Sequence, residues 1–202
     1  MTAHNRVFIG IAGGSTSGKT TLTAELARQW GDRVATLSYD EYYISRSKRP
    51  PVVEEESPEI YNNNAFLRDL KRLKVGQPIE IASDSRETAQ LGVGTRRVEP
   101  RPIILVEGYL IFHDPEVKSL FDKKFFVELS ENEMVKRRIQ RRDPLNPSRF
   151  DTDDYIQNVM LTGHRKYVLP QKNSVDVILD GKLSVKELAK ELELALQTAG
   201  LL

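Results

Sequence analysis

The sequence predicts an α/β fold in which a parallel β-sheet is flanked by helices. Two observations support this fold class. Short apolar runs alternate along the chain with segments of helical periodicity, as in folds built from repeated strand–helix units. The run at 102–106 is apolar at successive positions, which is typical of a strand covered on both faces of a parallel sheet.

The strands are expected at five apolar runs: 7–11, 34–38, 102–106, 125–129 and 175–179. A helix is expected from Lys19, with Leu22, Leu26 and Trp30 on one face and an end at Gly31. Two later helices are expected to open with capping boxes, Ser-x-x-Glu at 130–133 and again at 184–187.

Residues 41–101 interrupt the alternation of strands and helices. A Pro-Pro pair and three glutamates at 54–56 predict an irregular, exposed stretch, and a helix follows at 64–74. Residues 79–82 and 95–98 are expected to pair as a hairpin across a loop that holds Gly92 and Gly94. Because segments of this length within a compact domain are usually functional or disordered, we expect an insertion that covers a binding site.

A complete phosphate-binding motif, G-x-x-x-x-G-K-[ST], follows the first strand and opens the first helix. Glycines let the backbone N–H groups surround phosphate oxygens, and the helix N-terminus adds positive charge. Lys19 would reach the β- and γ-phosphates, and the Thr20 hydroxyl would hold Mg²⁺. The motif indicates the P-loop NTPase fold and ATP binding. Its residues are Gly13, Gly14, Ser15, Thr16, Ser17, Gly18, Lys19 and Thr20.

Two carboxylates are expected near this loop. Glu107 ends the strand at 102–106 and Asp40 follows the strand at 34–38. The carboxyl ends of parallel strands line the crevice where ligands bind. Glu107 would therefore serve Mg²⁺, and Asp40 would take the proton of an attacking hydroxyl.

A basic helix is expected around 134–142, within a lid region at 131–157. Arg138 and Arg141 lie three apart and so share a helix face. Arginines that close over a triphosphate would neutralise charge on the transferring group. The loop at 143–147 would let this helix move. The alternative is a solvated basic face.

Composition narrows the functional classes. The chain has 202 residues, a formal net charge of +1 and no cysteine, so disulfides, thiolate metal sites and a cysteine nucleophile are excluded. Near-zero net charge argues against nucleic acid as a partner. The first apolar run is too short for a signal peptide or a membrane span, and we expect a cytoplasmic protein consisting of one domain, 1–202. The sequence leaves open whether the protein forms a homo-oligomer.

Several segments, in the same order along the chain, resemble the uridine kinase–phosphoribulokinase family. Residues 10–21 (GIAGGSTSGKTT), which add Thr21 to the phosphate loop, resemble the family's opening. Residues 38–43 (SYDEYY) resemble the segment with the catalytic base, which maps to Asp40, and 106–112 (VEGYLIF) resemble the segment whose glutamate, here Glu107, serves magnesium. The resemblance implies a P-loop kinase that transfers the γ-phosphate of ATP to a small-molecule acceptor.

The resemblance also implies residues for the acceptor. Arg141 would stabilise the transferring phosphate, and the acceptor contacts would come from residues at the family's acceptor positions. These are Tyr43, Tyr61, Asn62, Asp84, Arg86, Arg138, Arg149 and Gln157.

The acceptor segments depart from the uridine kinase pattern. Residues 79–86 (IEIASDSR) keep the arginine but carry Asp84 in place of the histidine and lack the tyrosine, and 61–66 (YNNNAF) replace an Asp-His-Pro segment. We expect a ribonucleoside 5′-hydroxyl, with nicotinamide riboside as a close alternative and pantothenate or phosphoribulose as distant ones. A nucleotide-hydrolysing regulator is the non-kinase alternative, although no guanine-specific Asn-Lys-x-Asp motif occurs.

Overall fold

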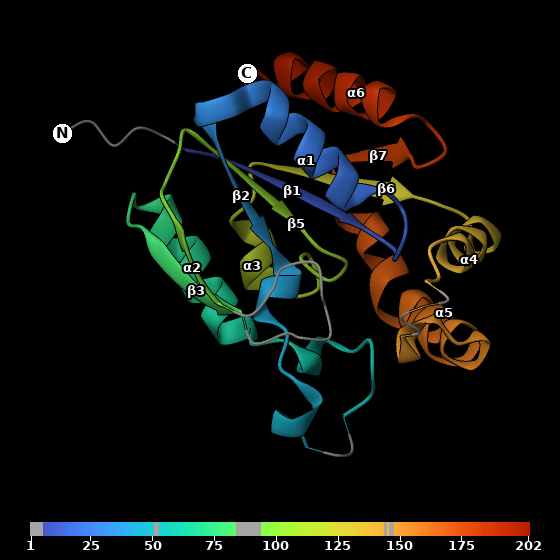
Figure 1. Cartoon of the computed structure of the whole chain (residues 1–202). Coiled ribbons are helices and arrows are strands. Elements are labelled where there is room, and N and C mark those ends of the chain that lie inside the picture. Colours follow the sequence, from blue (N-terminus) through green and yellow to red (C-terminus); the bar gives the residue numbers. More distant parts are fainter. Residues whose placement is uncertain (1–5, 51–52, 84–93, 144, 146–147) are drawn as a thin grey trace.

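A computed structural model describes residues 6–50, 53–83, 94–143, 145 and 148–202. Its main sheet has five parallel strands in the order β2-β5-β1-β6-β7 (Figure 1). The strands are β1 (Val7–Gly13), β2 (Val34–Ser38), β5 (Ile103–Glu107), β6 (Lys123–Glu128) and β7 (Val177–Asp180). All five predicted strands are present within about two residues of their expected bounds, and the predicted fold class is confirmed.

Two helices cover one face of this sheet, α1 (Lys19–Trp30) and α6 (Val185–Thr198), which lie side by side (Figure 1). Their buried leucines, such as Leu22 and Leu192, pack on strand side chains such as Ile11 and Leu105. The opposite face carries a second core with Phe8 and Val106. Successive residues of a strand thus pack into the two cores on opposite faces of the sheet. Because both faces are buried, the strand sequences are continuous apolar runs.

The predicted helix and hairpin of the 41–101 region are both present. The helix is α2 (Asn63–Lys74), which buries Phe66, Leu70 and Leu73 in the second core. The hairpin pairs β3 (Ile79–Ser83) with β4 (Gly94–Val98) in an antiparallel register. An ion pair of 2.6 Å between Arg96 and Glu41 joins the hairpin to the segment after β2.

The short helix α3 (Pro115–Ser119) also lies on this second face, where Val117 is buried. Beyond β6 the chain forms α4 (Glu131–Gln140) and then α5 (Leu161–Gly163), which is flanked by π-helical stretches at Tyr155–Met160 and His164–Val168. These elements form a separate lobe around their own apolar cluster, which includes Met134 and Ile156. Across the described ranges, no helix is long and apolar enough to cross a membrane.

The two predicted capping boxes differ in outcome. At α6 both halves form: Glu187 N donates to Ser184 Oγ at 3.4 Å, and Ser184 N donates to Glu187 Oε2 at 2.8 Å. At α4 Ser130 Oγ accepts from Glu133 N, but the return bond is not formed. The expectation of a full box was wrong there, because the Glu133 carboxylate turns along the helix toward Arg137, 3.8 Å away.

Candidate active site

The phosphate loop leaves the carboxyl end of β1, which lies between β5 and β6 in the sheet. Strand order reverses at this point, and such a switch point opens a crevice for a ligand. Gly18 adopts a left-handed φ of 100° and begins α1. A Cβ at Gly13 would lie 2.7 Å from the carbonyl oxygen of Val127 on β6, so this turn requires glycine at both positions.

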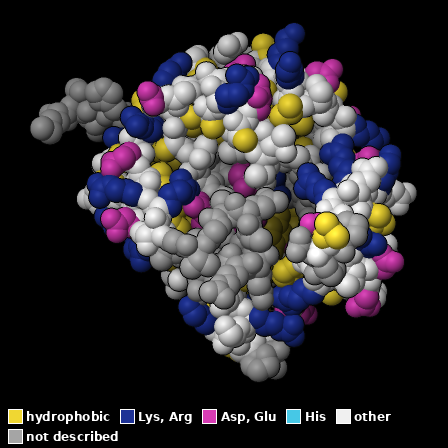
Figure 2. Space-filling view, in the orientation of Figure 1, with side chains coloured by type: hydrophobic (Ala, Val, Ile, Leu, Met, Phe, Trp, Pro, Cys, Tyr) yellow, Lys and Arg dark blue, Asp and Glu magenta, His cyan; other side chains and the backbone are white. Residues whose placement is uncertain are grey.

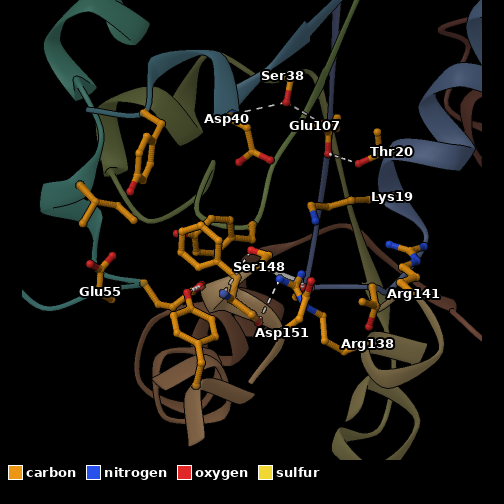
Figure 3. Close-up of a pocket in the computed structure, with 18 of the residues that line it drawn as sticks. Lys19, Thr20, Ser38, Asp40, Glu55, Glu107, Arg138, Arg141, Ser148 and Asp151 are labelled. Carbon is orange, nitrogen blue, oxygen red and sulfur yellow. Dashed lines mark hydrogen bonds and ion pairs between the residues drawn. The ribbon is translucent and has the colours of Figure 1, made fainter. Parts of the chain in front are cut away.

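A hydroxyl–carboxylate network connects the ends of β2 and β5 with the start of α1 beside this loop (Figure 3). Thr20 Oγ1 donates to Glu107 Oε2 at 3.2 Å, and Ser38 Oγ donates to Glu107 Oε1 at 2.7 Å. Lys19 is buried, and its amino group lies 3.5 Å from the Gly14 carbonyl oxygen. Burial raises the pKa of Glu107, and the opposite charge of Lys19 lowers it.

Asp40 lies in the 3₁₀ turn Tyr39–Tyr42, directly after β2. The Ser38 hydroxyl accepts a hydrogen bond from the Asp40 backbone N–H at 3.3 Å, and the Tyr61 hydroxyl donates to Asp40 Oδ1, also at 3.3 Å. Burial raises the pKa of Asp40, opposed by the charge of Lys19 and the hydrogen bond from Tyr61. The carboxylate is therefore both oriented and made more basic, as a proton acceptor requires.

Helix α4 supplies the arginines that the sequence singled out. Arg138 forms an ion pair with Asp151, with Nε 2.9 Å from Oδ1, and donates to the Phe150 carbonyl oxygen at 3.1 Å. Its Nη1 also lies 3.5 Å from Ser15 Oγ of the phosphate loop. In Figure 3 Arg138 and Arg141 lie on the same side of the site as Lys19.

These groups line one cavity of about 450 Å³, and Figure 2 shows a hollow between the sheet and the lobe of α4 and α5. Lys19, Arg138 and Arg141 lie at one end of it, beside the phosphate loop, and Glu55 lies at the far end (Figure 3). The residues around it are Ser15, Thr16, Lys19, Thr20, Ser38, Asp40, Tyr43, Glu55, Glu56, Ile60, Tyr61, Glu107, Tyr109, Arg138, Arg141, Ser148, Phe150, Asp151 and Tyr155.

A smaller hollow of about 280 Å³ lies on the other side of the phosphate loop, between α4 and the segment after β7. Gly18, Thr21 and Arg137 contribute to its wall, and Arg141 lines both hollows. Arg137 also donates to the carbonyl oxygen of Gly181 at 2.9 Å. A phosphate loop with a hollow on each side has room for a nucleotide and for a second molecule that meets its terminal phosphate.

The structure places the remaining predicted acceptor residues differently. Tyr43 and Tyr61 line the large cavity. Asn62 instead caps α2, where its side chain accepts from Ala65 N at 3.0 Å. Arg149 pairs with Glu55 at 3.3 Å, and Gln157 is exposed outside the cavity lining. Asp84 and Arg86 lie outside the described residues.

Several cavity residues were not foreseen from the sequence. Glu56 belongs to the stretch that was expected to be exposed, yet it lines the cavity with Tyr109, Tyr155 and Asp151. Only Tyr109 carried a usable signal, because it follows Glu107 by two residues at the end of a buried strand. The others come from segments far apart in sequence, so no local pattern could have grouped them.

A parallel sheet with a phosphate loop at its switch point, a carboxylate on the neighbouring strand and arginines above defines a P-loop phosphotransferase. The comparison with protein families agrees: residues 8–187 match the phosphoribulokinase / uridine kinase family. The chain belongs to this family and is a kinase of the uridine kinase type.

Relatives with known names include a uridine kinase from Chloroflexus aggregans, 33% identical over 96% of this chain and 98% of that protein. A uridine kinase from Oceanobacillus iheyensis is 30% identical over 89% and 88%. Among solved structures, a possible uridine kinase from Bacillus stearothermophilus aligns with a TM-score of 0.59 at 20% identity, over 87% of this chain and 89% of that one. Phosphoribulokinase from Rhodobacter spheroides aligns with a TM-score of 0.63 at 16% identity, over 87% and 70%. At these sequence identities, the similarity to the solved structures shows only that the fold is shared.

Proposed function

We propose that this protein transfers the γ-phosphate of ATP to the 5′-hydroxyl of a ribonucleoside, with uridine or cytidine as the first candidates. The observation that carries the proposal is the placement of Asp40 in the same cavity as Lys19 and Glu107. A proton acceptor, a phosphate-binding lysine and a candidate magnesium residue thus surround one space. The uridine kinases among the relatives support a nucleoside as the acceptor.

The donor would lie across the phosphate loop, with its terminal phosphates beside Lys19 and its remaining part toward the hollow with Thr21 and Arg137. Backbone N–H groups of the loop and the N-terminus of α1 favour phosphate oxygens. Arg141, which lines both hollows, would neutralise charge as the phosphoryl group moves.

The site fits Mg²⁺ through hard oxygen donors. Thr20 and Glu107 lie in hydrogen-bond contact, and no group of three or more His, Cys, Asp or Glu side chains suited to a metal occurs within the described residues. Mg²⁺ is commonly held by one or two carboxylates, nucleotide phosphates and waters. When bound, the ion would neutralise negative charge on the phosphates.

In the chemical step, Asp40 accepts the proton of the acceptor hydroxyl as its oxygen attacks the γ-phosphorus. The bond between the γ-phosphorus and the β–γ bridging oxygen breaks, and ADP leaves with the electron pair. Lys19 and Arg141 balance the charge on the equatorial oxygens. ATP and the alcohol thus give ADP, a phosphate monoester and one proton, which Asp40 accepts.

The far end of the cavity favours an uncharged or cationic acceptor. Asp40 and Glu56 line the cavity, together with the rings of Tyr61, Tyr109 and Tyr155. An anionic acceptor such as phosphoribulose or pantothenate would be repelled there. Nicotinamide riboside is the second candidate, since aromatic rings beside carboxylates suit a cationic base.

An ATP-consumption screen tests the proposal. Purified protein with ATP and Mg²⁺ is offered ribonucleosides, nicotinamide riboside, pantothenate and ribulose 5-phosphate, with product mass measured in parallel. The expected result is acceptor-dependent ADP formation with one phosphate added to a ribonucleoside. Phosphorylation of an anionic acceptor alone would refute the assignment, and acceptor-independent hydrolysis would favour the regulatory NTPase.

A further inference from the structure

Glu56 has a strained backbone at the wall of the acceptor cavity. Its φ is 64°, in the left-handed region that residues other than glycine rarely adopt. Strain of this kind persists where the surroundings hold the residue in place, and it is concentrated at functional sites. Here the surroundings include Gly163, where an added Cβ would lie 2.4 Å from the Cβ of Glu56. The close approach of the lobe with α5 therefore depends on glycine at 163.

The Glu56 carboxylate differs from its two neighbours in its partners. Glu54 pairs with Lys166 at 2.7 Å, and Glu55 pairs with Arg49 at 3.4 Å and with Arg149 at 3.3 Å. Glu56 forms no ion pair within the described ranges. It accepts a hydrogen bond at Oε1 from the hydroxyl of Tyr155, and Oε2 accepts none from any described residue.

The Glu56 carboxylate therefore has unused hydrogen-bond acceptor sites at the cavity. An ionised carboxylate has about four acceptor sites and no donor, and the hydroxyl of Tyr155 uses one of them. Burial raises the pKa of Glu56, and so does the negative charge of Asp40, whereas the hydrogen bond from Tyr155 and the charge of Arg138 lower it. A carboxylate that is partly removed from water without an ion pair is costly unless a ligand supplies hydrogen-bond donors.

We propose that Glu56 is a residue that holds the acceptor, by accepting hydrogen bonds from other hydroxyl groups of the molecule whose reacting hydroxyl Asp40 deprotonates. The inference rests on the proposed function and deepens it, because it assigns the recognised feature: a neighbouring pair of hydroxyls, as on the 2′ and 3′ carbons of a ribonucleoside. Tyr155 is a positioning residue that orients the carboxylate, and Gly163 leaves room for it.

The test compares acceptors that lack one hydroxyl. The kcat/KM values for a ribonucleoside and its 2′-deoxy and 3′-deoxy analogues are measured in wild type and in Glu56→Gln. Wild type should lose about 10- to 100-fold with at least one analogue, the range for a hydrogen bond to a charged group. Glu56→Gln should raise the KM of the ribonucleoside, leave the KM of ATP unchanged and discriminate several-fold less between ribonucleoside and analogue.

Three further variants separate the effect of the Glu56 carboxylate from effects of charge or folding. Glu54→Gln is the matched control: it removes the same charge two residues away, outside the cavity lining, and should keep the wild-type pattern. Glu56→Gly removes the carboxylate while glycine accepts the left-handed φ without strain, so it should fold and behave like Glu56→Gln. Tyr155→Phe should weaken discrimination less than Glu56→Gln does.

The outcomes separate this inference from the proposed function. Wild type that phosphorylates a ribonucleoside while Glu56→Gln discriminates equally well would overturn the role of Glu56 alone. An effect of Glu56→Gln confined to cationic acceptors, with no change for the deoxy analogues, would also overturn it and indicate charge recognition. Wild type without any ribonucleoside kinase activity would refute the proposed function, and this inference with it.

Discussion

Replacement of Asp40 by asparagine tests the proposed chemistry at its centre. Asparagine has nearly the same shape and can still hydrogen-bond a hydroxyl, but it cannot accept its proton at neutral pH. General-base assistance contributes about 10²–10⁴-fold, so kcat should fall by that factor, or about 2.7–5.4 kcal/mol in activation free energy. The KM of ATP should stay near the wild-type value, because Asp40 contacts Ser38 and Tyr61 rather than the phosphate loop.

The raised pKa of Asp40 predicts the sign of two further effects. The base works only when ionised, so wild-type kcat/KM should fall as pH drops through this pKa, and Asp40→Asn should lack that limb. Because the pKa is higher in the folded state than in the unfolded one, stability falls as pH rises through that interval. Asp40→Asn should therefore keep or raise the Tm at pH 7.

The assay is a steady-state titration of both substrates across pH, with thermal unfolding of the same samples. A tenfold or smaller loss of kcat, or an unchanged acid limb in Asp40→Asn, would refute Asp40 as the base. A collapse of Tm would show that the residue supports the fold instead.

Five other variants follow from the same structure. Lys19→Ala should abolish most phosphoryl transfer while circular dichroism shows an intact fold; near-normal turnover would exclude Lys19 from phosphate binding. Glu107→Gln should raise the Mg²⁺ concentration for half-maximal rate, and an identical Mg²⁺ titration would make Glu107 structural. Arg141→Ala should lower kcat more than it raises the acceptor KM, whereas Arg138→Ala should mainly raise that KM; the reverse pattern in initial rates would exchange their roles. Leu192→Ala, fully buried between α6 and the sheet, should cost about 2–5 kcal/mol in urea unfolding, and a loss below about 1 kcal/mol would contradict that packing.

Much of the fold could be predicted because its signals are local. A strand such as β5 is apolar at four consecutive positions, 103–106, because all four are buried, and the phosphate loop is a continuous motif between β1 and α1. The carboxylates of Asp40 and Glu107 follow from strand ends that share one edge of the sheet. Their roles in catalysis and metal binding stay predictions.

The part of the cavity lining around Glu56 and Tyr155 could not be predicted, because its residues come from segments that lie far apart in the sequence. Glu56 meets Tyr155, 99 residues away, and Arg138 joins the phosphate loop at Ser15 to the segment at Phe150. A run of three glutamates is usually a solvated stretch, yet Glu55 and Glu56 both line the cavity, and Gly163 packs against Glu56. The division into an acceptor insertion at 41–101 and a lid at 131–157 also stays a prediction.

The fate of the γ-phosphate tests the central claim most directly. The protein is incubated with Mg²⁺ and ATP that carries ³²P in the γ-position, with and without uridine, and the labelled products are separated. We predict label on the 5′-oxygen of the nucleoside in amounts equal to the ADP formed, and almost none after Asp40→Asn. Label released as inorganic phosphate at the same rate with and without any ribonucleoside would contradict the account.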